Sequence, residues 1–166
     1  MLPNNGITII AFDASLLTVG AVAVLDGYLA EAATFVHDTN KLRGLEKYAA
    51  VAAAQAADVR AFLDRYNRNI PVIVEAPANA DGTVWARRDT RVIFTGGLGT
   101  GVVFGVARAL GFERVEFVAA GARGGWGGKR NQFLAAALPG VELKTNHERD
   151  ASSMAVWYLS KHGGMR

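Results

Sequence analysis

The sequence predicts one α/β domain built on a mixed five-stranded sheet, with three antiparallel strands, then two parallel strands, and helices on both faces. Three observations predict it. Three apolar runs stand close together at the start of the chain, and two short apolar runs follow later, each after a long helical pattern. The chain has 166 residues, an ordinary size for one domain with a buried core. We therefore expect a single domain over residues 1–166.

The first three strands are expected near the N-terminus. One apolar run extends from Ile7 to Phe12 and a second from Val19 to Leu25. Asp26-Gly27 then gives a strong hairpin signal, because both residue types tolerate the positive φ of a tight two-residue turn. A third run, Tyr28 to Val36, follows. The chain therefore opens with an antiparallel meander.

Helical and strand patterns alternate in the rest of the chain. A polar loop is expected over residues 77–89, and a glycine-rich stretch over 121–128 has no regular pattern. The remaining elements are expected to be a helix over Gly44–Tyr66, a strand over Val72–Val74, a helix over Val92–Leu110, a strand over Val115–Ala119, a helix over Arg130–Leu138 and a helix over Glu148–Lys161.

Composition excludes several kinds of site. Cysteine is absent, so disulfides, thiolate zinc sites and a cysteine nucleophile are excluded, and any metal must be held by oxygen or imidazole. No apolar run approaches the roughly 20 residues of a membrane span, and Met1–Asn5 lacks the features of a secretory signal. We expect a cytoplasmic protein without a membrane partner. The formal net charge of +3 suits a polyanionic ligand without demanding one.

Three acidic residues stand where this fold would gather them. Asp13 ends the first predicted strand, Glu75 ends the fourth, and Asp150 lies at the start of the final helix. An unpaired carboxylate leaving an apolar strand is strongly disfavoured unless it meets a cation. Because the carboxyl ends of neighbouring parallel strands open on the same edge of a sheet, two such acids indicate a shared cation.

One histidine extends this acidic set. His147 stands three residues before Asp150, so both face one side of a helix. Oxygen ligands with one imidazole favour Mg²⁺, and Mn²⁺ can substitute. Each residue also has a purely structural interpretation. Asp13 could cap a turn, and Glu75 could be a surface acid. Asp150 could be an acid that the helix dipole favours near the helix N-terminus, and His147 could be a cap or surface residue.

Four segments resemble the motifs of RuvC-type Holliday-junction resolvases, which belong to the ribonuclease H-like superfamily. The likeness covers roughly residues 7–159 and is one of order and spacing more than identity. The chain departs from the family pattern by carrying Ala14-Ser15 where a Pro-Gly pair commonly follows the first aspartate. The similar segments are Ile9–Asp13 with Gly20 seven residues later, Val72–Glu75, Lys129–Phe133 and His147–Ala151.

The resemblance implies a ribonuclease H-like fold and a two-metal nuclease that hydrolyses phosphodiester bonds to 5′-phosphate and 3′-hydroxyl ends. It implies that Asp13 bridges the two ions, that Glu75 and Asp150 flank them, and that His147 is a ligand or a proton handler. It further implies a homodimer whose two sites make paired, symmetric nicks in a four-way junction.

Two basic segments are candidates for DNA contact. In the loop over residues 77–89, Trp85 could stack on an unpaired base while Arg87 and Arg88 bind phosphates. The second segment carries Arg123, Lys129 and Arg130 and includes Trp126. The alternative interpretation is two solvated basic faces, with the tryptophans packed inward.

The helix predicted over Val92–Leu110 contains a glycine-rich stretch. Gly96–Gly101 lacks the Gly-Lys-Ser/Thr ending of a phosphate loop and follows no strand, so a nucleotide-binding loop is excluded. Gly97, Gly101, Gly105 and Ala109 recur every four residues, which predicts a smooth stripe that another helix or the sheet can approach closely. The family resemblance implies that this helix lies at or near a dimer interface.

Other functions stay open on the sequence alone. A nuclease of the same fold could act on an RNA/DNA hybrid or on flap or other branched DNA. An ATP-binding module of the actin or sugar-kinase kind also begins with a strand, an aspartate and a hairpin, but normally needs two such domains. A non-catalytic protein that binds branched DNA is the remaining alternative.

Overall fold

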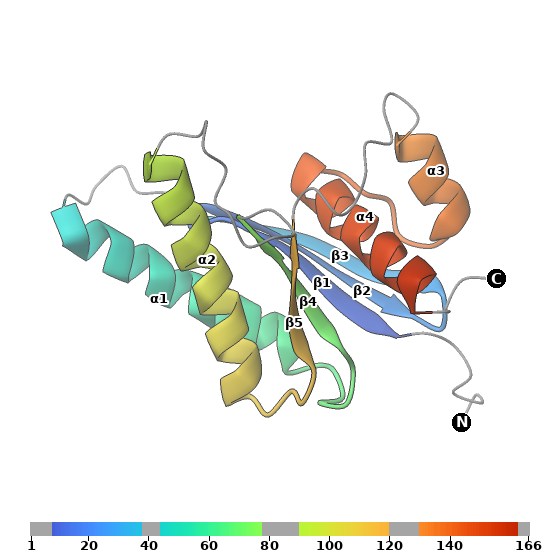
Figure 1. Ribbon diagram of the computed structural model, residues 1–166, viewed down its shortest axis with the longest axis horizontal. Helices are drawn as coiled ribbons and strands as arrows, with labels where there is room; N and C mark the ends of the chain where they lie inside the picture. The colour runs from blue at the N-terminus through green and yellow to red at the C-terminus, as the bar shows by residue number, and fades with distance from the viewer. Residues whose placement is uncertain (1–7, 38–43, 78–89, 120–129, 163–166) are drawn as a thin grey trace.

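The computed structural model describes residues 8–37, 44–77, 90–119 and 130–162 (Figure 1). The predicted order of strands and helices is confirmed. In chain order the elements are β1 (Ile9–Ala14), β2 (Thr18–Leu25), β3 (Tyr28–Val36), α1 (Gly44–Leu63), β4 (Val72–Ala76), α2 (Thr90–Ala109), β5 (Val115–Ala119), α3 (Arg130–Ala137) and α4 (Asn146–Lys161).

The strands form one mixed sheet in the order β3-β2-β1-β4-β5. The first three strands pair antiparallel, whereas β4 pairs parallel with both β1 and β5. Asp26 and Gly27 connect β2 to β3 with φ values of 53° and 80°, the positive φ that a two-residue turn of type I′ requires. The sheet topology and the hairpin therefore agree with the sequence-based prediction.

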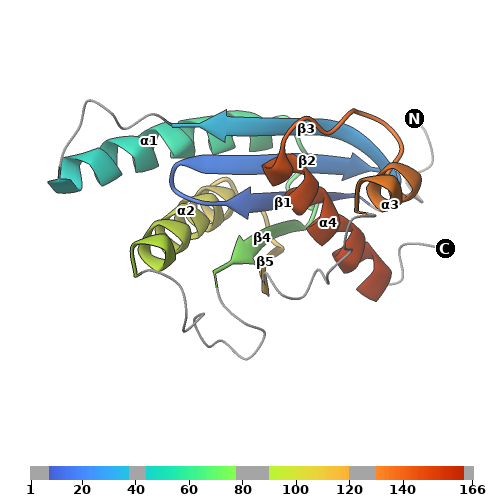
Figure 2. The same cartoon turned by 90° about the horizontal axis from the view of Figure 1, so that it is seen from above.

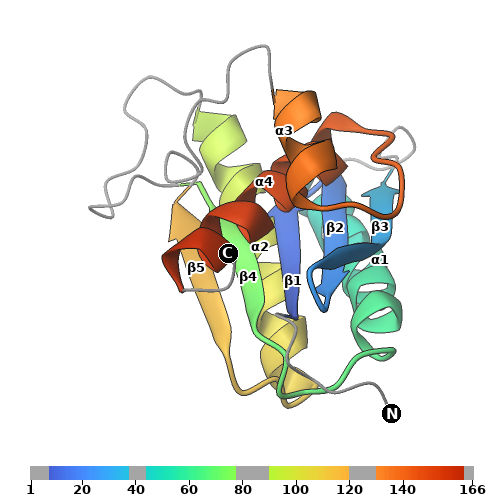
Figure 3. The same cartoon turned by 90° about the vertical axis from the view of Figure 1, so that its right-hand side faces the viewer.

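Helices cover both faces of the sheet. Figure 3 shows α4 crossing in front of the strands with α1 and α2 behind them, and α3 beside α4. Phe12 and Phe62 belong to the core between the sheet and the α1/α2 pair, whereas Ile73 and Met154 belong to the core under α4. No helix in the described part of the chain is long and apolar enough to cross a membrane.

Several predicted boundaries were wrong, and three of them are the following. Strand β1 ends at Ala14, so Asp13 lies inside the strand, because its pairing with β2 continues through Asp13 and Ala14. Helix α1 ends at Leu63 instead of Tyr66. Helix α4 begins at Asn146 instead of Glu148, which places Asp150 in the second turn of the helix instead of at its start.

Candidate active site

The two strand-borne carboxylates, Asp13 and Glu75, occupy neighbouring positions at one edge of the sheet. The parallel ladder of β1 and β4 pairs Phe12 with Val74, so the next residue on each strand is one of these acids. Alternate residues of a strand face the same side, and Ile73, two residues before Glu75, belongs to the core under α4. Both carboxylates therefore lie on the face of the sheet that α4 covers, which we call the α4 face. Figure 2 shows the carboxyl ends of β1 and β4 side by side.

The start of α4 is anchored above the β2–β3 side of the same edge. A capping box links Thr145 and Glu148, each side chain accepting a hydrogen bond from the other's backbone N–H at 3.1 Å. Glu148 also accepts from the Thr34 hydroxyl at 2.9 Å and from the Lys144 N–H at 2.6 Å. These bonds account for the burial of Glu148 and give it a structural role.

Gly20 allows the first turn of α4 to reach the sheet beside Asp13. It lies directly opposite Asp13 in the β1–β2 ladder. A Cβ atom at this position would lie 2.3 Å from the backbone C and O atoms of His147, far inside van der Waals contact. The glycine is therefore a steric requirement for placing His147 over this strand end.

His147 contacts Asp13 directly. Its Nδ1 lies 2.7 Å from Asp13 Oδ2, with the Asp13 side chain 18% exposed and the His147 side chain 42% exposed. The hydrogen bond to Asp13 raises the pKa of His147 above its ordinary value, partial burial acts in the opposite direction, and the charges of Asp13 and Asp150 add to the increase. The carboxylates at this edge therefore favour the charged form of His147 over the neutral form.

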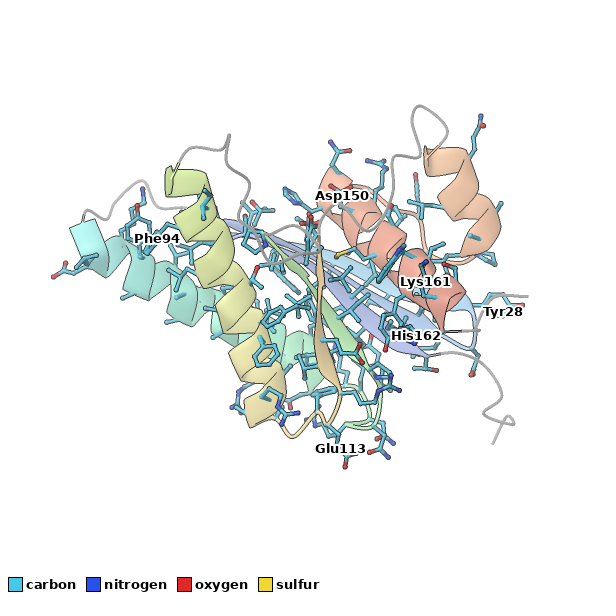
Figure 4. The ribbon with its side chains drawn as sticks, in the orientation of Figure 1. Tyr28, Phe94, Glu113, Asp150, Lys161 and His162 are labelled. Atoms are coloured by element: carbon cyan, nitrogen blue, oxygen red, sulfur yellow. The ribbon has the colours of Figure 1, made fainter. Side chains whose placement is uncertain are left out.

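Asp150 stands three residues after His147 on α4, and Figure 4 shows it on the N-terminal half of that helix. Its carboxylate is close enough to His147 to contribute to the pKa increase. Among the described residues, however, no three acidic or histidine side chains lie together as a ready-made metal site. The structure thus brings His147 and Asp13 into contact and places Glu75 and Asp150 on the same face.

The donor atoms of these four residues are of the kinds that a hard divalent cation binds. Asp13, Glu75 and Asp150 offer carboxylate oxygens and His147 offers an imidazole nitrogen, the donor types that suit Mg²⁺ and Mn²⁺. Asp13 and Asp150 both act to raise the pKa of His147, so the surrounding carboxylates favour positive charge at this position. This electrostatic property is what a bound metal ion would need.

The turn after Asp13 closes without the Pro-Gly pair of the family pattern. The Ser15 hydroxyl donates to the Thr18 carbonyl at 3.0 Å and accepts from the Thr18 N–H at 3.2 Å. The Ser15 N–H also donates to the same carbonyl at 3.0 Å. A serine side chain therefore supplies the closure of this turn.

The residues expected to contact DNA lie mostly outside the described residues. This applies to Trp85, Arg87 and Arg88, and equally to Arg123, Trp126 and Lys129. Arg130 is the first residue of α3, and its side chain is not described. Their roles stay predictions.

Among the described residues, nothing packs against the glycine stripe of α2, so a close approach there stays a prediction for a partner chain. A Cβ atom on Gly97, Gly101 or Gly105 would meet nothing within 4 Å, and all three are exposed in the described structure. The close approach occurs at Gly99 instead, where a Cβ atom would lie 2.4 Å from the carbonyl carbon of Ser15. The four-residue repeat marks a smooth helix face, but that face points away from the sheet.

Sequence reasoning missed the residues that hold the site in place. The pattern Thr145-x-x-Glu148 is a capping-box signal that was visible in the sequence. Thr34 and Thr100, which donate hydrogen bonds to Glu148 and to the Glu75 carbonyl, had no such signal. Their partners lie 114 and 25 residues away along the chain, so only the fold reveals them.

Comparison with solved structures identifies the fold. The structure of T. thermophilus RuvC in complex with Holliday junction substrate matches with a TM-score of 0.72 and 15% identity, over 96% of this chain and 98% of that chain. The fold is that of RuvC. A second Thermus thermophilus RuvC structure matches with a TM-score of 0.67 and 16% identity, over 96% of this chain and 99% of that chain. No protein-family model matches the sequence, and a search of curated proteins found no match.

The RuvC fold explains how residues far apart in the sequence meet. The mixed sheet makes β1 and β4 parallel neighbours. The last helix, α4, then crosses the sheet so that His147 lies next to Asp13. At 15% and 16% identity the likeness to RuvC establishes the fold alone. The chemistry of this chain has to be argued from its own residues.

Proposed function

We propose that the chain is a divalent-metal-dependent endonuclease that resolves four-way DNA junctions. The observation that carries the proposal is the contact of His147 with Asp13, next to Glu75 on the same face of the sheet. The structure of this fold from T. thermophilus was solved with a Holliday junction substrate, which supports the same substrate class here. A mild positive net charge agrees with a polyanionic substrate.

The proposed mechanism assigns roles to four side chains. Asp13, Glu75 and Asp150 would hold Mg²⁺ or Mn²⁺, and His147 would be a further ligand or would move a proton. The bound ions would activate water and stabilise the departing oxygen. In the hydrolysis, the water oxygen forms a bond to phosphorus and the bond from phosphorus to the 3′ oxygen breaks. The 3′ oxygen gains a proton, which leaves 5′-phosphate and 3′-hydroxyl ends.

Paired nicks in a junction require two active sites related by a two-fold axis. We place the homodimer contact on the exposed glycine face of α2, where Gly97, Gly101 and Gly105 leave room for a second helix. The DNA contacts assigned to Trp85, Arg87 and Arg88, and to Arg123, Lys129 and Arg130, belong to the same proposal. Aromatic stacking on an unpaired base and arginine contacts to phosphate would suit an opened junction.

The direct test is cleavage of a labelled mobile four-way junction beside a linear duplex and an RNA/DNA hybrid, with Mg²⁺, Mn²⁺ or EDTA. Wild type, Asp13→Asn and Asp150→Asn are compared with Asp26→Asn as the matched control. Asp26 is exposed at the hairpin, and asparagine tolerates its positive φ equally well. We expect symmetric, metal-dependent nicks in wild type and in Asp26→Asn.

Both site variants should lose cleavage by about 10³-fold, because several kcal/mol of charge stabilisation depend on the bound cations and each 1.36 kcal/mol is tenfold in rate. Cleavage of the hybrid alone would move the protein to a ribonuclease function. Junction binding without cleavage under any metal would overturn the catalytic proposal in favour of a binding protein.

A further inference from the structure

The buried side of helix α2 contacts the ends of both strands that carry the candidate ligands. It does so on the face of the sheet that α1 and α2 cover, which we call the α1/α2 face and which lies opposite to the carboxylates. Thr100, which is 4% exposed, donates its hydroxyl hydrogen to the Glu75 carbonyl oxygen at 2.9 Å. The β1–β4 ladder ends at Phe12 and Val74, one residue before Glu75. The Thr100 hydroxyl therefore binds the backbone of β4 where pairing with β1 stops.

The adjacent residue of α2 holds the segment that follows Asp13. Gly99 packs so closely that a Cβ atom would lie 2.4 Å from the carbonyl carbon of Ser15 and 2.6 Å from the nitrogen of Leu16. The Leu16 N–H donates to the Thr95 carbonyl at 3.0 Å. Two consecutive residues of α2 thus contact the β1 and β4 ends at the same time.

Helix α1 supports this turn of α2 from behind. Gln55 is fully buried, and its Nε2 donates to the Gly99 carbonyl at 3.2 Å. A buried amide on an otherwise apolar interface is costly unless it forms hydrogen bonds. The Gly99-Thr100 step therefore makes polar contacts on both sides, with Gln55 of α1 and with the Glu75 backbone of β4.

We infer that Thr100 is a positioning residue that sets the place of the Glu75 carboxylate through a hydrogen bond to the Glu75 backbone. The inference rests on the proposed metal-dependent function and assigns Thr100 no contact with substrate. A displacement of about 1 Å in a catalytic group can cost about 100-fold in rate, and loss of an outer partner typically costs 10–100-fold in metal affinity or activity. The hydroxyl, not the bulk, of Thr100 should carry the effect.

The test compares Thr100→Val, which keeps the shape and removes the hydroxyl, with Thr100→Ser, which keeps the hydroxyl. Thr100→Ala is a second hydroxyl-free variant that introduces no new atoms. Thr8→Val is the matched control, because Thr8 precedes β1 at the other end of that strand. Mn²⁺ affinity is measured by calorimetry without DNA, and single-turnover junction cleavage is measured over a Mg²⁺ titration below the unfolding temperature of each variant.

We expect Thr100→Val and Thr100→Ala to bind Mn²⁺ about 10–100-fold more weakly and to need correspondingly more Mg²⁺ for half-maximal cleavage. Junction affinity in EDTA should stay unchanged, and Thr100→Ser should return both quantities to within a few-fold of wild type. Wild-type Mn²⁺ affinity in the valine and alanine variants, or a serine variant as weak as they are, would overturn the inference. Because Mn²⁺ binding is measured without DNA, this result is independent of whether the wild type cuts junctions.

Discussion

The two faces of the sheet end differently at the edge where β1 and β4 finish. On the α4 face, the apolar positions Ile9 and Ala11 lead to Asp13, and the acid then meets His147. On the α1/α2 face, the buried Phe12 leads to Ala14, and the side chains stay apolar to the end of the strand. A shift of one residue in register would exchange the two sets.

The two faces together show how a stable sheet can carry carboxylates that are unfavourable to bury. The α4 face carries the charged groups, while the α1/α2 face supplies a continuous apolar core and also holds the backbone of the same strand ends through α2. Substitutions on the apolar face should therefore reduce stability first. Substitutions of the charged side chains at the strand ends of the α4 face should reduce chemistry first, whereas the apolar residues under α4 belong to a core of their own.

The largest effect on stability should come from a substitution on the α1/α2 face. Phe62 is 1% exposed and makes edge-to-face contacts with Phe12 and Phe35 at centroid distances of 5.7 and 6.2 Å. Phe62→Ala should lower the free energy of unfolding by about 3–5 kcal/mol, measured by urea denaturation. The control is Phe117→Ala, since Phe117 is 54% exposed and should cost much less. Equal costs for the two variants would contradict the assignment of this core.

Gly20→Ala tests the α4 face. The added Cβ atom would overlap the His147 backbone, so the first turn of α4 must move away from Asp13. We expect junction cleavage to fall by about 100-fold, because a small misplacement of a catalytic group has that cost. The free energy of unfolding should fall by about 1–3 kcal/mol as α4 adjusts. A wild-type cleavage rate would show that the approach of His147 to Asp13 is not needed.

Thr145→Ala should give a smaller change in stability. It removes the side-chain acceptor of the capping box and the hydroxyl that lies 2.6 Å from Thr34. The expected loss is about 1 kcal/mol in the free energy of unfolding. A loss below the error of the measurement would mean that Glu148 and its remaining donors suffice to hold the start of α4.

The smallest effect should be a pH dependence at His147. Its folded-state pKa is raised above the ordinary 6.5, so its pairing with Asp13 stabilises the metal-free protein fully below about pH 6.5 and loses this contribution as pH rises through the raised value. NMR titration of the imidazole should give a midpoint above 6.5 that falls in Asp13→Asn and is unchanged in Asp26→Asn. Added Mg²⁺ should lower the midpoint, because a cation opposes the proton. A midpoint unaffected by Asp13→Asn would contradict the pairing.

The sequence could predict the sheet and the positions of its acids because alternation and strand order are local patterns. The run ending at Asp13 and the run ending at Glu75 each read as a strand, and the parallel pairing of those strands follows from the element order. The helix that carries His147 was predicted two residues short at its N-terminus, because the prediction followed apolar periodicity and did not use the capping-box pattern Thr145-x-x-Glu148.

Other features depended on tertiary contacts that no local pattern encodes. The repeat of Gly97, Gly101 and Gly105 showed which face of α2 is smooth, but not whether that face packs against another element. Gly99, outside that repeat, makes the close contact, with the backbone of Ser15 and Leu16. The contact between Asp13 and His147 joins residues 134 positions apart. Spacing along the chain can place such residues at one edge but cannot give their distance.

The most direct test of the central claim is Mn²⁺ binding, measured by calorimetry on wild type, Asp13→Asn and Asp26→Asn in the absence of DNA. The claim is that the carboxylates and the imidazole at the β1–β4 edge form a divalent-metal site. We predict that wild type and Asp26→Asn bind Mn²⁺ equally and that Asp13→Asn binds more than about 100-fold more weakly, since removing a direct ligand should exceed the effect of losing an outer partner. Equal affinity of Asp13→Asn and wild type, or no binding by any of the three proteins, would contradict the claim.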